Sequence, residues 1–371
     1  MSYICDLCGK EFPTQWKLTR HFRRTTPCVG RGGGQLGIEI AIQTDDFPYK
    51  RLSMDEATVR ARFEALKTYR PTFSGHVWNV RNIPNISPLM LKYKGEWCLL
   101  ELSSEQYFTQ DLITDWVIED VRVKSRRSDT ELSPHDYWQQ HRDEVKAVAQ
   151  NDPLGATPHN LREALWKLAP EAGTFRPTVA VALMRRFNMT RVIDMSAGWG
   201  DRLVAAMATN GVVEYWGTDP NTDLEKRYLE LAGMFAPRQS SQYTVLASKF
   251  EDAEIPHSDF DGSIISPPFL DLELYTGGDQ NVPDMTLEEF IDWLVECLRK
   301  ITRHLQIGSR LCLNMNDIRN GAKYTETIVR RFTGEPNIEY EGAIGFGEIK
   351  YRRGRAQLRS TQPLWIFRKT A

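Results

Sequence analysis

Apolar residues recur three and four positions apart in two parts of the first half of the chain. This spacing predicts helices over residues 55–69 and 134–150. Between them, residues 89–102 and 114–123 contain alternating or β-rich stretches bounded by polar turns, which predict strands. The mixture predicts an α+β region, and its residues indicate no chemistry of their own.

The pattern changes after residue 176, where amphipathic helices and short apolar strands alternate along the chain. Alternation of this kind is typical of an α/β fold with a parallel sheet. The expected helices cover residues 177–187 and 201–209, and the expected strands cover residues 191–194, 214–218, 310–315 and 364–367.

Acidic residues end two successive strands of this predicted sheet. Asp194 ends the first strand, a glycine-containing turn follows at residues 195–200, and Asp219 ends the second strand. This arrangement binds the adenosine part of a cofactor at the switch point of a doubly wound sheet. The glycines would let the backbone approach the cofactor, and Asp219 would accept both ribose hydroxyls. The turn alone does not distinguish NAD from S-adenosylmethionine.

Three further sequence motifs favour S-adenosylmethionine. Residues 192–200 resemble motif I of class I methyltransferases, and residues 248–252 are similar to the third cofactor motif of that family. Residues 175–177 resemble the segment that amino-methyltransferases place before motif I, with arginine where lysine is usual. The resemblance implies that the cofactor is bound by Phe175, Arg176, Pro177, Asp194, Ser196, Gly198, Gly200, Asp219, Phe250 and Asp252.

The tetrapeptide Ser266-Pro267-Pro268-Phe269 is similar to motif IV of the DNA amino-methyltransferases. An exocyclic base amine is a poor nucleophile, so acceptors must hold its hydrogens while its lone pair turns toward the methyl group. Ser266 Oγ and the Pro267 carbonyl are the expected acceptors. The two prolines would stiffen the loop, and Phe269 would offer a face to a base swung out of its stack. These four residues are the predicted catalytic group.

Residues 1–30 resemble a zinc finger of the ββα type. Cys5, Cys8 and His21 combine ligand types that zinc prefers with the spacing of such a finger. Cys28 is the expected fourth ligand, although it lies farther along the chain than the family's usual second histidine. A segment of this length cannot bury enough surface to fold without metal, so a structural Zn²⁺ is predicted.

These patterns divide the chain into four predicted parts. The expected fold class is α/β, with a Rossmann-like class I methyltransferase domain preceded by a mixed α+β region and a small ββα zinc finger. The parts are the finger at residues 1–30, a flexible glycine-rich linker at 31–48, the mixed region at 49–160 with a role in target recognition, and the methyltransferase domain at 161–371.

Charge adds a weak indication of nucleic-acid binding. The net charge is −2, so the chain as a whole does not attract a polyanion, but basic clusters lie at residues 17–31, 124–127 and 350–359. DNA is the favoured partner and RNA remains an alternative. The longest apolar runs are far shorter than the ~20 residues that span a bilayer, so no membrane association is expected. A soluble intracellular protein is predicted, in cytoplasm or nucleus, and a viral or phage origin is one alternative. The sequence does not predict an oligomeric state.

Two questions of function stay open at this point. A serine in the first position of the Ser-Pro-Pro-Phe motif resembles cytosine-N4 enzymes, whereas the order of the motifs is commoner among adenine-N6 enzymes. One alternative function is methylation of RNA, a nucleotide or a protein amide. Another is a zinc-finger binding protein whose methyltransferase fold is inactive.

Overall fold

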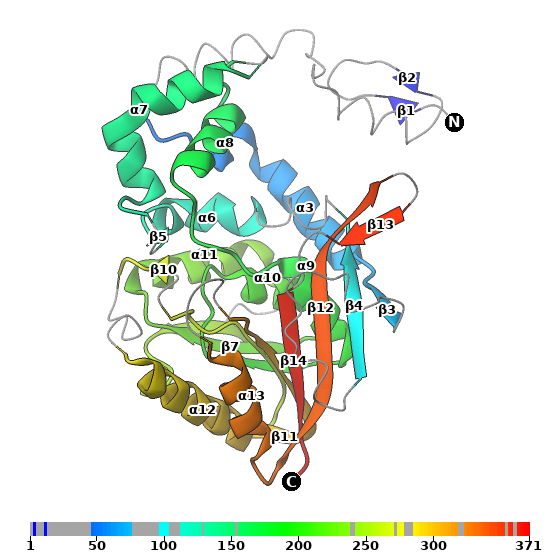
Figure 1. The fold of residues 1–371 in the computed structure, drawn as a ribbon. Helices are drawn as coiled ribbons and strands as arrows, with labels where there is room; N and C mark the ends of the chain where they lie inside the picture. The colour runs from blue at the N-terminus through cyan, green and yellow to red at the C-terminus, as the bar shows by residue number, and fades with distance from the viewer. Residues whose placement is uncertain are drawn as a thin grey trace. The chain divides into compact units, whose positions relative to one another are not determined.

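The computed structural model describes much of the chain in two compact units, each built from two stretches of sequence (Figure 1). Unit 1 combines residues 1–55 and 122–172, and unit 2 combines residues 56–121 and 173–371. The described residues are 3–4, 11–12, 46–75, 96–103, 112–127, 130–152, 155–237, 242–270, 273–277, 285–317, 323–352, 355–358 and 362–371.

Unit 1 is helical in its second stretch. Helices α7 (Pro134–Gln150) and α8 (Pro158–Leu168) both begin with proline, directly after an N-cap residue. The Ser133 and Thr157 hydroxyls each accept a hydrogen bond from the third residue of their helix, which satisfies a free backbone N–H. An apolar core around the fully buried Trp138 joins the two helices, and a short 3-10 helix, η1 (Lys50–Ser53), contacts α8.

Glu171 is the buried charged centre of unit 1. Burial alone would raise the pKa of this carboxyl, but the guanidiniums of Arg122 and Arg162 outweigh it and hold the pKa well below its usual range. Arg122 Nη1 donates to Glu171 Oε2 over 2.5 Å, and Arg162 donates to the other oxygen. Losing Glu171 would leave two buried guanidiniums without this counter-charge, so the carboxylate stabilises this unit.

Near the N-terminus, strands β1 (Tyr3–Ile4) and β2 (Glu11–Phe12) pair antiparallel, with Tyr3 opposite Phe12. The predicted zinc ligands Cys5, Cys8, His21 and Cys28 lie outside the described residues, as does most of the predicted linker at residues 31–48. The zinc finger therefore stays a prediction.

Unit 2 contains a ten-stranded sheet, with nine strands in the order β3-β4-β12-β14-β11-β9-β6-β7-β8 and β13 paired to β12. Strands β8, β7, β6, β9 and β11 are parallel, and β14 runs antiparallel to both of its neighbours. The strands are β3 (Thr72–Gly75), β4 (Glu96–Leu102), β6 (Arg191–Asp194), β7 (Glu214–Asp219), β8 (Tyr243–Ala247), β9 (Phe260–Ile265), β11 (Leu305–Asn314), β12 (Ile338–Arg352), β13 (Arg355–Leu358) and β14 (Gln362–Lys369).

The order of the parallel strands confirms the predicted α/β fold class with a Rossmann-like parallel sheet. From β6 the chain runs outward through β7 to β8, then returns to β9 on the other side of β6 and continues to β11. The strand order thus reverses between β6 and β9. In doubly wound sheets, ligands bind beyond the carboxyl ends of the strands at such a switch point.

The helices of unit 2 pack on this sheet in two groups. Helices α3, α9 and α10 contact one another, whereas α12 and α13 form a separate pair (Figure 1). Helix α12 begins with a capping box between Thr286 and Glu289 and buries a long apolar face in the main core. The helices are α3 (Glu56–Thr68), α6 (Leu112–Arg122), α9 (Pro177–Arg186), α10 (Asp201–Ala208), η3 (Thr222–Leu224), α11 (Glu225–Phe235), α12 (Leu287–His304) and α13 (Thr325–Thr333).

The structure corrects one predicted element and divides the predicted mixed region differently. Residues 114–123 were expected to form a strand, but most of them belong to helix α6. Their β-branched residues favour strands, yet Ile113, Val117 and Val121 lie four apart and bury one helix face, and this burial outweighs the local preference. Strands β3 and β4 join the sheet of unit 2, so residues 49–160 are shared between both units.

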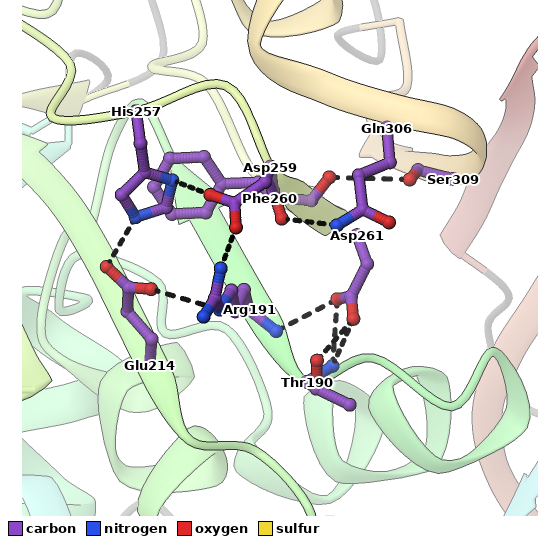
Figure 2. Close-up of polar contacts among 9 residues, drawn as sticks. All are labelled: Thr190, Arg191, Glu214, His257, Asp259, Phe260, Asp261, Gln306 and Ser309. Carbon is purple, nitrogen blue, oxygen red and sulfur yellow. Dashed lines mark hydrogen bonds and ion pairs between the residues drawn. The ribbon is translucent and has the colours of Figure 1, made fainter.

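A network of charged side chains holds the amino ends of β6, β7 and β9 together (Figure 2). His257 lies between Glu214 and Asp259, with its Nε2 atom 2.8 Å from Glu214 Oε1. Arg191 pairs with Asp259 and lies 3.7 Å from Glu214 Oε2. These contacts join the amino ends of three strands.

Asp261 extends this network to the backbone at the start of the neighbouring strand β6. Its carboxylate accepts hydrogen bonds from the Thr190 and Arg191 amides at 2.8 and 2.9 Å, and from the Thr190 hydroxyl (Figure 2). Because one carboxylate serves two consecutive amides at the start of β6, it fixes where that strand begins relative to β9. We call the residues Thr190, Arg191, Glu214, His257, Asp259 and Asp261 the amino-edge network.

Candidate active site

Asp194, the last residue of β6, lies beneath the glycine turn and is fully buried. Its carboxylate accepts hydrogen bonds from the Ser196 amide at 3.0 Å, Arg202 Nε at 2.6 Å and the Tyr215 hydroxyl at 2.6 Å. The Arg202 guanidinium also donates to the Ser196 carbonyl. The structure therefore places Asp194 as an anchor for the turn, with donors from three directions.

The surroundings of Asp194 keep its partners in their donor forms. Burial, and next the charge of Asp194, raise the pKa of the Tyr215 hydroxyl well above its usual range. Burial alone would lower the pKa of Arg202, but Asp194 outweighs it and the net pKa is raised. Removing one partner of a buried ion pair of this kind lowers the free energy of unfolding by about 3–5 kcal/mol in general.

The glycine turn is tight because neighbouring side chains occupy the space beside it. Gly200 has a φ of 78°, and a Cβ atom at this position would lie 2.9 Å from Leu231 Cδ1. Both the left-handed backbone and this contact require glycine. The Gly198 carbonyl accepts a hydrogen bond from the Tyr228 hydroxyl at 2.6 Å, so the turn is held from the side of α11 as well.

Asp219 ends β7 and faces the same turn. One carboxylate oxygen accepts from the Gly198 amide at 2.8 Å and the other from the Asn221 amide at 3.0 Å. Its exposed fraction is 9%, and this burial raises the pKa of the carboxyl to about 6 despite both hydrogen bonds. Each oxygen has a second lone pair, so the carboxylate can still accept hydroxyl groups of a ligand.

The Ser-Pro-Pro-Phe loop follows β9 and is bonded to the glycine turn. Ser196 Oγ donates to the Ser266 carbonyl over 2.9 Å, and Asn314 Nδ2 donates to Ser266 Oγ over 3.2 Å. Pro267 is buried, whereas Ser266, Pro268 and Phe269 are half-buried. Two of the motifs quoted from the sequence therefore meet at the carboxyl ends of β6 and β9.

The segment at residues 175–177 lies at the start of α9, with Pro177 as its first residue. The Phe175 side chain is buried, and the Arg202 guanidinium lies 5.1 Å from its ring centre. Phe175 thus packs against the same arginine that pairs with Asp194, while Arg176 is half-buried. This segment therefore lies beside the glycine turn.

The residues expected to hold the adenine have different surroundings from one another. Phe250 is 2% exposed and belongs to the main apolar core, with its ring 6.5 Å from that of Trp216. Asp252 is exposed. Ser248, directly after β8, has a buried Oγ atom without a hydrogen-bond partner. A polar atom left unpaired at a strand's carboxyl end is a candidate ligand contact.

Several residues of this site are not indicated by any sequence motif. Arg202 and Tyr215 hold Asp194, Asn314 holds Ser266, and Asn221 holds Asp219. Asn314 carries the clearest signal, because it is a polar residue at the end of a predicted apolar strand. The other three lie within helices, strands or turns where polar residues are common.

Within the described part of the chain, no group of three or more His, Cys, Asp or Glu side chains is arranged to hold a metal ion. None of the described helices is long and apolar enough to cross a membrane.

The chain resembles solved methyltransferase structures at low identity. A tRNA methyltransferase of Aquifex aeolicus is 15% identical with a TM-score of 0.38, over 54% of this chain and 71% of that one. An S-adenosylmethionine-dependent O-methyltransferase of Thermotoga maritima is 14% identical with a TM-score of 0.36, over 54% of this chain and 68% of that one. An rRNA methylase of Streptococcus thermophilus is 14% identical with a TM-score of 0.34, over 54% of this chain and 100% of that one. No protein-family model and no curated protein matches the chain. Similarity at this level indicates no substrate.

Proposed function

We propose that this protein transfers a methyl group from S-adenosylmethionine to an exocyclic amino group of a nucleic-acid base. The observation that carries the proposal is the hydrogen bond from Ser196 Oγ to the Ser266 carbonyl. It holds the loop that resembles the amine-binding motif beside the turn that resembles the cofactor motif. Transfer requires the methyl donor and the acceptor amine to lie side by side, and these two loops meet at the switch point of the sheet.

The carboxyl edge of the sheet offers groups that fit the cofactor. Asp219 would accept the ribose hydroxyls, and the glycine turn would lie along the cofactor because no side chain projects from Gly198 or Gly200. Asp194 and Arg202 would hold that turn in place from below. The unpaired Ser248 Oγ would reach the adenine edge, with Asp252 as the residue that the motif resemblance suggests. Bound here, the cofactor supplies an activated methyl group on sulfur.

Ser266 would prepare the amine for attack. Its Oγ accepts one hydrogen bond from Asn314 and retains a second lone pair for an N–H of the target base. The Pro267 carbonyl would take the other N–H. Holding both hydrogens turns the nitrogen lone pair toward the methyl group, which stabilises the transition state more than the ground state.

DNA is the proposed substrate, with cytosine N4 or adenine N6 as the methylated position. The argument comes from the Ser-Pro-Pro-Phe motif, the basic clusters and the zinc finger, whose proposed role is docking onto nucleic acid with Zn²⁺ on Cys5, Cys8, His21 and Cys28. RNA, a free nucleotide and a protein amide are the alternative acceptors.

The test is to incubate the full chain with methyl-labelled S-adenosylmethionine and duplex DNA, single-stranded DNA or RNA in parallel. Digestion to nucleosides followed by mass analysis identifies the methylated base. Label in N4-methylcytosine or N6-methyladenine from DNA is the expected result. Label only in RNA would change the substrate, and label in none of them together with no calorimetric affinity for the cofactor would favour a binding protein with an inactive fold.

A further inference from the structure

Residues 273–277 contact three segments of the proposed cofactor site. They follow the Ser-Pro-Pro-Phe loop in the sequence and include the short strand β10 (Glu273–Leu274). We call residues 273–277 the strap. Its contacts reach the segment before α9, the glycine turn and the loop after β7, all of which belong to unit 2.

Glu273 binds the strap to the segment before α9. Its Oε1 atom accepts a hydrogen bond from the Gly173 amide over 2.6 Å. The Gly173 carbonyl in turn accepts from Trp199 Nε1, in the glycine turn, over 2.9 Å. Gly173 therefore links the strap to the glycine turn, and it lies just before Phe175 and Arg176 in the chain.

Tyr275 binds the strap to the glycine turn. Its ring centre lies 5.9 Å from that of Trp199, and its hydroxyl donates to Glu273 Oε2 over 2.6 Å. Burial raises the pKa of this hydroxyl well above its usual range, and the negative charges of Glu273 and Asp219 raise it further. Tyr275 therefore stays protonated and donates to Glu273.

Gly277 binds the strap to the loop after β7. Its φ is 82°, and a Cβ atom there would lie 2.9 Å from Asp223 Oδ2 and closer still to Asn221 Oδ1. The Asn221 amide is one of the donors to Asp219. Only glycine allows the strap to approach this loop so closely.

We propose that the strap gates the cofactor site, so that it must move away before S-adenosylmethionine enters or S-adenosylhomocysteine leaves. This inference rests on the proposed function. The strap touches the three segments that would surround the cofactor, and β10 is not part of the ten-stranded sheet, so these contacts can break without unfolding that sheet. Glu273 and Tyr275 act here as positioning residues, since they would hold other residues around the cofactor.

The experiment measures how fast S-adenosylhomocysteine leaves the full-length protein, by stopped-flow displacement with Trp fluorescence as the signal. Glu273→Ala removes the acceptor for both Gly173 and Tyr275, so the dissociation rate should rise about tenfold. Glu273→Gln keeps one acceptor and should restore much of the slow dissociation. Tyr275→Phe loses one hydrogen bond but keeps the ring pair, so a rise of about threefold is expected. Asp292→Ala, an exposed residue of α12 paired with Arg331, is the matched control and should leave the rate unchanged.

A second readout separates gating from general damage. In Glu273→Ala the KM for S-adenosylmethionine should rise while kcat stays equal or increases, and thermal unfolding should remain cooperative. If wild-type protein binds the cofactor but Glu273→Ala and Tyr275→Phe release it at the wild-type rate, the gating proposal is wrong and the proposed function stands. If wild-type protein binds neither S-adenosylmethionine nor S-adenosylhomocysteine, both proposals fail.

Discussion

Two acidic residues on opposite edges of the parallel sheet have different partners. On the amino edge, Asp259 contacts the side chains of Arg191 and His257 (Figure 2). On the carboxyl edge, Asp219 is held by the backbone amides of Gly198 and Asn221.

This difference distinguishes an ion pair that aligns strands from the carboxylate of the proposed cofactor site. The amino-edge pair Arg191 and Asp259 keeps 40% and 46% of its side-chain surface exposed, where water screens the charges and the main effect is to align strands. Asp219 is 9% exposed and is held by neutral amides rather than by a cation. Such a carboxylate retains both its charge and its acceptor capacity for a ligand, which explains why the proposed chemistry lies on that edge.

The largest effect is expected from the acceptor loop on the carboxyl edge. Ser266→Ala removes the proposed acceptor for the amine, and loss of one such group lowers turnover about 100- to 1,000-fold. Cofactor affinity, measured by calorimetry, should stay near that of the wild type. Ser258→Ala, an exposed serine near the amino edge, is the control. A large loss of cofactor affinity in Ser266→Ala would show that the acceptor pocket is misplaced.

The next effect should appear in cofactor binding. Asp219→Ala removes two charge-assisted contacts to the ribose, which together contribute about 3 kcal/mol or more, so the Kd for S-adenosylmethionine should rise at least about 100-fold. Calorimetry under the same conditions compares the Kd of Asp219→Ala for S-adenosylmethionine with that of Ser266→Ala. An unchanged Kd in Asp219→Ala would contradict the assignment of the ribose site.

On the amino edge, a substitution should change stability and not binding. Asp261→Ala leaves the Thr190 and Arg191 amides without their acceptor, so the free energy of unfolding should fall by about 1.5 kcal/mol. Urea denaturation measures this, and the control is Asp292→Ala, an exposed ion pair expected to change stability by about 0.5 kcal/mol or less. If Asp261→Ala weakened cofactor binding at constant stability, the division between the two edges would be wrong.

The smallest effect is the pH dependence of binding. Burial raises the pKa of Asp219 to about 6, and the ribose hydroxyls would donate to its ionised form. Affinity for S-adenosylmethionine should therefore fall about tenfold from pH 7 to pH 5. The pKa of Asp219 is higher in the folded protein than in the unfolded chain. Protonation of Asp219 therefore increases the free energy of unfolding as the pH falls through about 6 toward 4. The loss of affinity over this range is thus not caused by acid unfolding at Asp219. Asp219→Asn should abolish this pH dependence, and a slope that persists in Asp219→Asn would assign it to another group.

Some features of the carboxyl edge follow from short stretches of sequence. The strands that end on Asp194 and Asp219 and the helix beginning at Pro177 appear where the pattern predicts them. Such features depend on neighbouring residues, through strand alternation, proline at a helix start and glycine in a turn. The α/β fold class follows from the same alternation.

Other features depend on segments that meet only in the folded chain. The bond from Ser196 to Ser266 joins residues 70 positions apart, and the bond from Gly173 to Glu273 joins residues 100 positions apart. Strand order and register decide these contacts, because local sequence patterns do not predict which loops lie at the same edge of the sheet. Packing also decided that Phe250 belongs to the core and that residues 112–122 form a helix, since burial of a whole face outweighs local preference.

The sequence by itself thus determined the fold class, the acidic strand ends and the candidate acceptor loop, because each depends on residues that lie close together in the sequence. Tertiary structure alone decided that Asp194 is a buried anchor while Asp219 faces the turn, and that the strap contacts the glycine turn and the loop after β7. Burial and hydrogen-bond partners distinguish the two aspartates, and both depend on how distant segments pack together.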